Sequence, residues 1–430
     1  MSYSPNTVLI GGLTMKRLLI ILMICLIFLC SCSDKNEGTV IVDEQYNLET
    51  DMQYYYRTCN GNYMQAITAS NKGYYYSGTD GKVFYIDRDS QKAAPLCDKV
   101  NCDHTNKNEC NAFLIKDNNF GPNGIYLGNA MQYYEGKLYY IDNRYDDMKM
   151  EGKYYLAKCD PDGRNIEKVT DNLKRQEGAS DWYLHRGYLY FVTSKTIYRL
   201  PLSNTEQEPE ILFELGEGYD EYVNNIENHS KIYDDGLYFT YTPSGIQNTE
   251  GDDDMKQYWR KINLDTKEIT KLVFDGKSVE PVTFVNNRMY FEVLEEEKRV
   301  WKIYVSDLDL SNVQEIGEHN TGTLFYTDGN YIYLDMEASI SLSGAPNPDV
   351  YKDQTITIYD MKMENEIDSF KLPSIVQVPR ASMQDKNCFI FNITGKGEDA
   401  VSKLYYLDKS KIGTFNGDYP EMTELCEVKK

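Results

Sequence analysis

The chain has 430 residues, with 45 Lys and Arg against 67 Asp and Glu, and its formal net charge is −22. Such an acidic surface repels nucleic acids and other polyanions, so we expect no nucleic-acid partner. A hydrophobic fraction of 41% is enough for a folded core. Tyrosine is the outlier with 38 residues, and Tyr, Phe, Ile and Val at alternating positions favour strands. The composition therefore predicts an all-β protein.

The N-terminal segment has the pattern of a secretory signal. The cationic stretch from Met15 to Arg17 precedes an unbroken apolar run from Leu18 to Leu29, which is too short to span a bilayer. The run ends in Leu-Cys-Ser-Cys32, which resembles the lipobox of bacterial lipoproteins. This resemblance implies cleavage before Cys32 and a lipid on that cysteine. Residues 1–14 lack a cationic stretch, so Met15 is a second candidate for the start of the protein.

These features divide the chain into three parts. Residues 1–31 are predicted to be the signal peptide, 32–50 the lipidated Cys32 with a polar tether, and 51–430 the folded domain. We expect the mature protein to lie outside the cytoplasm, anchored to the cell membrane by its lipid. Ser33 after the cysteine favours the outer membrane if the organism has one. Removal of the leader deletes two basic residues and no acid, so the mature chain carries a formal charge of −24.

A short unit, a tight turn followed by an aromatic strand, recurs seven times in the folded domain. The equivalent aromatic or apolar positions are Tyr75, Tyr139, Tyr190, Tyr238, Tyr290, Tyr333 and Ile390. They lie about 52 residues apart on average. Each copy also contains a second alternating strand, a polar turn and a last short strand, which makes four strands with the one before the tight turn.

Four-stranded units of this length, repeated four to eight times, are typical of a β-propeller. The sequence therefore predicts a seven-bladed β-propeller, with the repeated tyrosines packed between blades. A β-sandwich or a pair of smaller β domains would not repeat one motif seven times at one period. The segment 155–170 resembles the repeats of TolB-like propellers.

The two faces of this propeller are predicted to differ. If the strands of a blade are called A to D, the A–B and C–D turns open on one face, and the B–C and D–A connections on the other. The A–B turns are tight, at Glu135-Gly136, Arg186-Gly187, Asp235-Gly236, Asn286-Asn287 and Asp328-Gly329. Long connections on a rigid scaffold are where binding residues gather. We therefore expect a ligand to contact segments of the second set, at 97–130, 143–153, 242–257 and 336–354.

Aromatic and acidic side chains in these connections are the candidates for ligand contact. The aromatic ones would stack on a sugar ring or fill a pocket of a partner, and the alternative for them is packing within their own loops. The acids are candidates for calcium, although they lack the spacing of an EF-hand loop. The candidate residues are Tyr145, Tyr241, Asp252, Asp253, Asp254 and Tyr351.

An insertion between the first two blades, 97–130, gathers cysteine and histidine. Cys97, Cys102, His104 and Cys110 have the spacing C-x4-C-x-H-x5-C. Three cysteines and one histidine are a known ligand set for structural zinc, and a small loop without a core gains most from a metal. A disulfide among these cysteines is the competing interpretation, because the location is extracytoplasmic; the cysteine left over would pair with Cys59 or stay free. Plain thiols are the third alternative. Three further cysteines in apolar strands are expected to be buried thiols: Cys159, Cys388 and Cys426.

The leader, the tyrosine-rich repeats and the C-x4-C-x-H-x5-C segment together resemble a family of clostridial surface lipoproteins with DUF5050-type propellers. The resemblance implies a location and a fold, and it carries no activity.

No catalytic motif is present in the sequence: there is no GxSxG, HExxH, P-loop or GxGxxG after a strand. His185, His229 and His319 are expected to be solvated residues of turns and loops. The favoured function is a non-enzymatic, monomeric surface protein that binds a glycan, a peptide or an envelope protein. Two alternatives stay open, a polysaccharide lyase or hydrolase whose acids come from separate loops, and an envelope assembly scaffold.

Overall fold

The computed structural model describes residues 67–78, 81–114, 131–146, 151–171, 173, 181–215, 226, 230–241, 258–320, 323–336, 354–372, 380–394 and 401–428. The predicted signal peptide, Cys32 and the tether lie outside these residues. All of the described residues belong to one compact unit, Asp43–Lys430. None of them forms a helix long and apolar enough to cross a membrane.

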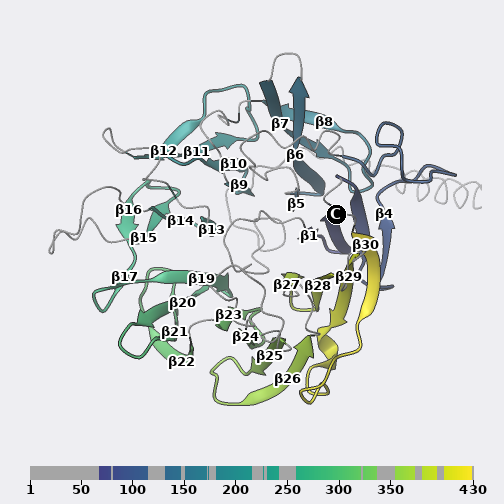
Figure 1. Ribbon diagram of the computed structural model, residues 1–430. Coiled ribbons are helices and arrows are strands. Elements are labelled where there is room, and N and C mark those ends of the chain that lie inside the picture. Colours follow the sequence, from purple (N-terminus) through teal and green to yellow (C-terminus); the bar gives the residue numbers. More distant parts are fainter. Residues whose placement is uncertain are drawn as a thin grey trace, which may run out of the picture. The chain divides into compact units, whose positions relative to one another are not determined.

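The unit is a β-propeller of seven four-stranded antiparallel sheets, as predicted. Figure 1 shows the sheets arranged in a ring, with the first strand of each blade nearest the centre. Blade 1 consists of β1 (Ile67–Ala69), β2 (Gly73–Ser77), β3 (Val83–Asp87) and β4 (Lys92–Pro95). Blade 2 consists of β5 (Met131–Tyr134), β6 (Lys137–Asp146), β7 (Glu151–Cys159) and β8 (Glu167–Thr170). Blade 3 consists of β9 (Asp181–His185), β10 (Tyr188–Val192), β11 (Thr196–Pro201) and β12 (Glu210–Glu214).

The other four blades follow in chain order. They are β13 (Lys231–Tyr233), β14 (Gly236–Thr240), β15 (Trp259–Asn263) and β16 (Ile269–Lys271); β19 (Glu280–Val285), β20 (Arg288–Glu295), β21 (Val300–Asp307) and β22 (Gln314–Asn320); β23 (Thr323–Thr327), β24 (Ile332–Met336), β25 (Gln354–Tyr359) and β26 (Glu366–Leu372); and β27 (Arg380–Gln384), β28 (Cys388–Thr394), β29 (Ser402–Asp408) and β30 (Thr423–Val428).

The apolar core lies in the seams between blades. The described residues form seven hydrophobic clusters, and each joins two neighbouring blades, including the seventh and the first. The seven repeat positions from Tyr75 to Ile390 lie on the second strands and are all buried. Burial of one such side chain contributes about 1.5–3 kcal/mol to folding. The predicted role of the repeated tyrosines as inter-blade core is confirmed.

The A–B turns of blades 2, 3 and 5 are tight because both of their central residues adopt left-handed backbone angles. Glu135 and Gly136 have φ of 45° and 75°, and Asn286 and Asn287 have 52° and 56°. Positive φ at both central residues is the pattern of the two-residue turns that match strand twist. One predicted turn is displaced by a residue, since Tyr233 pairs with Gly236 and the turn is therefore Asp234-Asp235.

Three C–D turns share a hydrogen bond that the sequence analysis did not foresee. An Asp at the end of the third strand accepts from the side-chain amide of an Asn five residues later, with N···O distances of 2.6 Å. The pairs are Asp160 with Asn165, Asp307 with Asn312, and Asp360 with Asn365. The turns are thereby closed by their own side chains.

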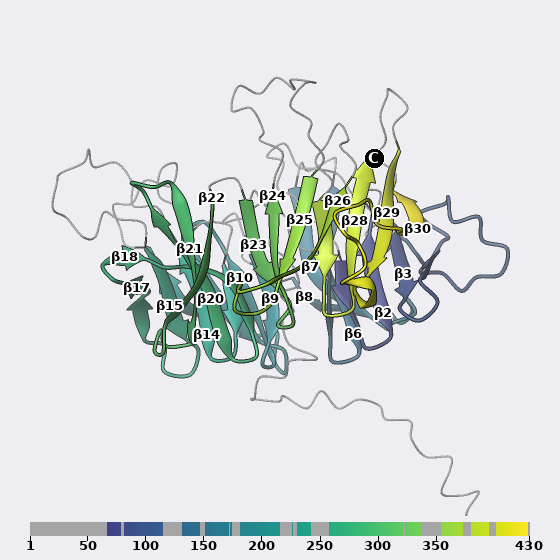
Figure 2. The same ribbon diagram turned by 90° about the horizontal axis from the view of Figure 1, so that it is seen from below.

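The B–C side differs from the prediction in one connection and contains an addition. Strands β6 and β7 continue to Asp146 and from Glu151, so the predicted loop 143–153 is mostly a long hairpin. The addition is a short hairpin between blades 4 and 5, made of β17 (Val273–Phe274) and β18 (Lys277–Ser278), which belongs to no blade. In Figure 2 this hairpin lies at the outer edge of the ring.

Side chains at the end of the first strand connect neighbouring blades. The Tyr134 hydroxyl accepts a hydrogen bond from the Gly187 amide of the next A–B turn, at 2.8 Å. The Tyr233 hydroxyl accepts from the Asn287 amide in the same way, at 3.2 Å. His185 occupies the equivalent place in blade 3, and its Nε2 lies 2.7 Å from the Asp234 carbonyl oxygen. His185 is fully buried, so the prediction of a solvated residue is wrong.

The ring closes by side-chain contacts between blades 7 and 1. In every described sheet the strands are consecutive in sequence, so no strand is exchanged between the two ends of the chain there. Ile67, Tyr74 and Ile86 of blade 1 share a hydrophobic cluster with Ile390 and Leu404 of blade 7. Apolar burial thus joins the first and last blades.

Candidate metal centre and inter-blade groove

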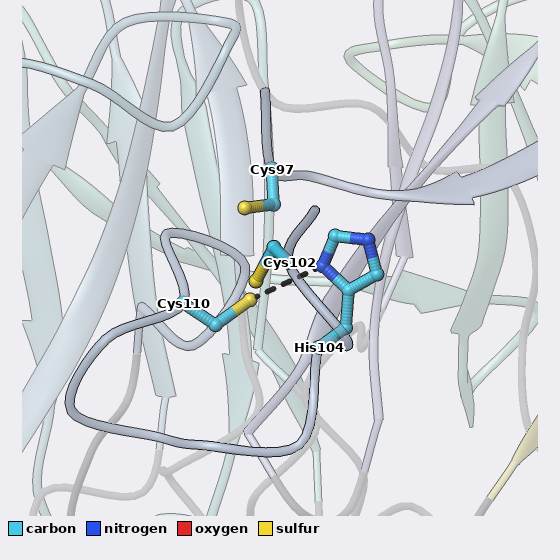
Figure 3. A group of neighbouring side chains, drawn as sticks. All are labelled: Cys97, Cys102, His104 and Cys110. Carbon is cyan, nitrogen blue, oxygen red and sulfur yellow. Dashed lines mark hydrogen bonds between the residues drawn. The ribbon is translucent and has the colours of Figure 1, made fainter. Parts of the chain in front are cut away.

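The side chains of Cys97, Cys102, His104 and Cys110 come together in one place. Their ligand atoms all lie within 4.8 Å of one another, and His104 Nδ1 is 3.4 Å from Cys110 Sγ. Figure 3 shows the four side chains converging from separate stretches of the loop. The set that the sequence analysis selected is therefore one spatial cluster.

The backbone of the loop explains this convergence. Asn101 and His104 adopt left-handed φ of 62° and 56°, which reverses the chain on either side of Cys102. The Cys102 amide donates to the Lys99 carbonyl at 3.3 Å, and the Cys110 amide to the Asn106 carbonyl at 2.9 Å. Each ligand residue thus lies at or beside a hydrogen-bonded turn.

The cluster has the chemistry and the dimensions of a zinc site. Tetrahedral Zn²⁺ holds thiolate sulfur at about 2.3 Å and imidazole nitrogen at about 2.0–2.1 Å, which puts neighbouring ligand atoms about 3.5–3.8 Å apart. The separation of 3.4 Å between His104 Nδ1 and Cys110 Sγ is close to this value, and all of the ligand atoms lie within 4.8 Å of one another. All three cysteines are free thiols, so the structure contains no disulfide among them.

The thiols of the cluster have unequal acidity. Burial raises the pKa of the Cys110 thiol to about 11. Burial acts in the same direction on Cys97, but hydrogen bonds from the backbone N–H groups of Lys99 and Asn111 outweigh it and lower the pKa of that thiol. Zinc binds the thiolate form, and of these two thiols Cys97 loses its proton more readily than Cys110.

The loop that carries the cluster packs against the seam between blades 1 and 2. The Val83 amide of β3 donates to the Ala112 carbonyl at 2.8 Å, and Phe113 forms an isolated β-bridge with Lys82. Asp98 lies 3.4 Å from the Arg164 guanidinium in the C–D turn of blade 2. The insertion therefore contacts a turn of the face that the sequence analysis considered plain.

A second site is a groove of about 900 Å³ between blades 4 and 5. Its walls are the β17–β18 hairpin and the turn that joins β20 to β21. Trp259, Val293 and Trp301 contribute apolar surface, and Glu296 and Glu297 lie on the turn. The groove is on the B–C and D–A side, where a ligand was expected, but outside the four predicted segments.

The ligand-face candidates have different outcomes. Asp252, Asp253, Asp254 and Tyr351 lie outside the described residues. Tyr145 lies in β6, where it pairs with Gly152, so its assignment to a loop is wrong.

Tyr241 is half-buried rather than an exposed loop residue. Its ring stacks on Phe213 with centroids 5.8 Å apart, and the Arg260 guanidinium lies 4.0 Å above it. Packing, the alternative considered for Tyr241, therefore describes this side chain.

The described residues contain no second candidate metal cluster. Among the described residues, the Cys/His set is the only group of three or more His, Cys, Asp and Glu side chains with ligand atoms close together. His319 is buried with its Nε2 2.7 Å from a Glu292 carboxylate oxygen, so it is not a solvated loop residue. Asp181 at the start of β9 accepts a hydrogen bond from Ser230, and burial raises its pKa to about 6. His229 lies outside the described residues.

Sequence reasoning missed the groove, Asp181 and the roles of the two histidines. The groove depends on the β17–β18 hairpin, which is not part of the repeat, so the repeat pattern does not reveal it. The acid run at residues 295–297 was recognisable on the B–C and D–A face as a candidate for calcium, but nothing in the sequence linked it to the hairpin.

Comparisons with known proteins give only distant similarities. No protein-family model and no curated protein sequence matches the chain. Solved structures that resemble it include an oligogalacturonate lyase from Vibrio parahaemolyticus, with 13% identity, a TM-score of 0.40, and 68% of this chain and 75% of that chain covered. The β-propeller domain of the Trilobed protease from Pyrococcus furiosus has 10% identity and a TM-score of 0.38, with 68% of this chain and 81% of that chain covered. The tricorn protease has 13% identity and a TM-score of 0.33, with 88% of this chain and 31% of that chain covered. These similarities say nothing of the chain's activity.

Proposed function

We propose that the protein is a non-enzymatic, monomeric surface lipoprotein whose propeller binds an envelope partner through its B–C and D–A face. The observation that carries the proposal is the groove between blades 4 and 5 on that face. Its walls are an extra hairpin and a lengthened B–C hairpin, neither of which a propeller needs in order to close. The lipobox and the family resemblance support attachment through a lipid on Cys32.

Cross-linking in cells tests the choice of face. A photoreactive side chain at Lys298, in the B–C turn of blade 5, should give discrete cross-linked products. The same group at Lys362, an exposed residue in a C–D turn, is the control. Cross-linked products from Lys362 alone would contradict the proposal. Absence of products from both positions would mean that neither face contacts a partner in these cells.

We also propose that the Cys97, Cys102, His104 and Cys110 cluster holds a structural zinc ion. Four protein ligands complete the tetrahedral coordination of zinc, so such a site has no open position for catalysis. The zinc would fix the insertion against blades 1 and 2. Removal of metal by a chelator should increase hydrogen exchange at Val83 and Cys110 and leave blade 5 unchanged. Equal exchange before and after chelation would contradict a structural role for a metal.

A further inference from the structure

A lysine and an aspartate are buried together in the seam between blades 6 and 7. The Lys409 ammonium lies 2.5 Å from the Asp328 carboxylate oxygen Oδ2, and each side chain is only 3% exposed. Lys409 is the first residue of the short 3-10 helix Lys409–Lys411, which follows β29, and Asp328 lies in the turn between β23 and β24. The two residues are 81 positions apart in the chain. An amine and a carboxyl group from different blades therefore meet where water is excluded.

Blades 3 and 4 have an apolar residue at the position that Lys409 occupies in blade 7. In each of these three blades the backbone amide at this position donates to a carbonyl of the A–B turn, from Leu202, Leu264 and Lys409. Leu202 and Leu264 pack into the seam with the preceding blade. Burial of two ions in such a seam removes hydration that their mutual attraction recovers only in part. The repeat therefore does not require a charged pair at this position.

Aromatic rings enclose the amine of Lys409. The ring centroids of Phe389 and Tyr333 lie 4.3 and 4.4 Å from its nitrogen. Burial lowers the pKa of Lys409, although the Asp328 carboxylate opposes this shift. The neutral amine is the nucleophilic form of lysine, and a desolvated site favours this form. The seam thus provides the conditions under which a lysine side chain can act as a nucleophile.

Hydrogen bonds hold the Asp328 carboxylate in one orientation. Its Oδ1 accepts from the amides of Asn330 and Tyr331, at 2.9 and 3.0 Å. Its Oδ2 accepts from the Tyr333 hydroxyl at 2.7 Å as well as from Lys409 at 2.5 Å. Three donors besides the lysine therefore point at the two oxygens, where negative charge develops when an amine adds to the carbon between them. Reactants fixed in this way react far faster than the same groups in solution.

We propose that Lys409 and Asp328 condense to an intramolecular isopeptide bond, which joins blades 6 and 7 covalently. The Lys409 nitrogen adds to the side-chain carbon Cγ of Asp328. Two of the three ammonium protons pass to Oδ2, which leaves as water when its bond to Cγ breaks, and the third proton stays on the amide nitrogen. The step needs no oxidant and no cofactor. Its product is neutral, so the two charges buried in the seam are removed. The bond forms whatever the propeller binds.

Peptide mass mapping of the purified full chain tests the inference. Tryptic digestion of the unfolded wild-type chain should give a branched peptide that contains both Asp328 and Lys409, lighter than its two parts by one water. Trypsin should not cleave after Lys409, because an acylated lysine carries no charge. Lys409→Arg keeps a cation beside the carboxylate, as Arg88 does 3.8 Å from Asp385 in the next seam, but a guanidinium does not form this amide.

Lys409→Arg and Lys409→Met should therefore give only unbranched peptides of full mass. The matched control is Lys411→Arg, which changes an exposed lysine 3.6 Å from Glu421 and should retain the branched peptide. The wild-type result decides the question even if a variant fails to fold. Recovery of Asp328 and Lys409 from the wild-type chain only in unbranched peptides of full mass would overturn the inference. A branched peptide at Asp328 that persists in Lys409→Arg would also overturn it.

Discussion

The hydroxyl of Tyr74 in blade 1 donates a hydrogen bond to the carboxylate of Asp385 in blade 7, with an O···O distance of 2.8 Å. The two residues are 311 positions apart in the chain, and their contact spans the seam where the ring closes. Asp385 also accepts from the amides of Asn387 and Cys388, at 2.7 and 2.9 Å. One carboxylate therefore closes the A–B turn of blade 7 and joins it to blade 1.

Loss of this hydroxyl should weaken the closing seam. Tyr74→Phe leaves a buried carboxylate with one hydrogen bond fewer, and we expect the free energy of unfolding to fall by about 1–3 kcal/mol. Tyr238→Phe is the matched control, because the buried Tyr238 hydroxyl has no hydrogen-bond partner among the described residues. Urea unfolding should show a loss only for Tyr74→Phe. Equal changes in both variants would mean that the bond to Asp385 contributes nothing specific.

His185 should make the protein sensitive to acid. Burial lowers the pKa of His185 to about 4, whereas an unfolded histidine titrates near 6.5. The unfolded state therefore binds more protons between these values. Stability from this group is complete above about pH 6.5 and falls as the pH decreases toward 4, by up to about 3 kcal/mol.

His185→Tyr tests this dependence, because Tyr134 and Tyr233 occupy the equivalent places in blades 2 and 4. The variant should lose less stability than the wild type between pH 6.5 and pH 4. Parallel stability curves for the two proteins over this range would contradict the assignment.

Asp181 should give the free energy of unfolding a pH dependence opposite to that of His185. Burial raises the pKa of Asp181 to about 6, above the value near 3.9 in an unfolded chain. The native state therefore binds more protons between these values, and its stability falls as the pH rises through them. Asp181→Asn should abolish about 2 kcal/mol of this fall, measured by urea unfolding at pH 4 and pH 7. The exposed Asp89→Asn is the control, and an identical effect there would refute a specific role for Asp181.

The sequence was sufficient for the repeating part of the fold. Tyr75, Tyr190 and Tyr333 lie where their period places them, because each blade must bury the same strand position against its neighbour. Cys97 and Cys110 were recognisable as partners, since ligands of a metal loop are close in sequence. Only their spatial contact required the structure.

Features that depend on contacts between distant segments could not be predicted. Nothing in the sequence pairs Tyr74 with Asp385, and His185 seemed exposed because it adjoins a tight turn. Its burial follows from the neighbouring blade, whose Asp234 carbonyl covers it. The loop assignment of Tyr145 failed because the strands of this hairpin are as rich in polar residues as loops are.

Substitutions of His104 should show whether metal binding depends on the chemistry of the ligand or on the packing of the loop. His104→Cys provides four thiolates, another zinc set, and should retain the metal, whereas His104→Ala should lose it. Cys426→Ser, which changes a half-buried thiol outside the cluster, should keep its zinc. Loss of the metal should lower the free energy of local opening around Val83 by about 3 kcal/mol at zinc near 100 times its Kd, as seen by hydrogen exchange. Metal loss from Cys426→Ser alone would place the site elsewhere.

The most direct test of the metal centre is the metal content of the purified chain, measured by plasma mass spectrometry together with its intact mass under denaturing conditions. The account predicts about one zinc per chain, and an intact mass that corresponds to free thiols at Cys97, Cys102 and Cys110. A chain without metal, whose mass is lower by two hydrogens with a disulfide mapped to these cysteines, would contradict it.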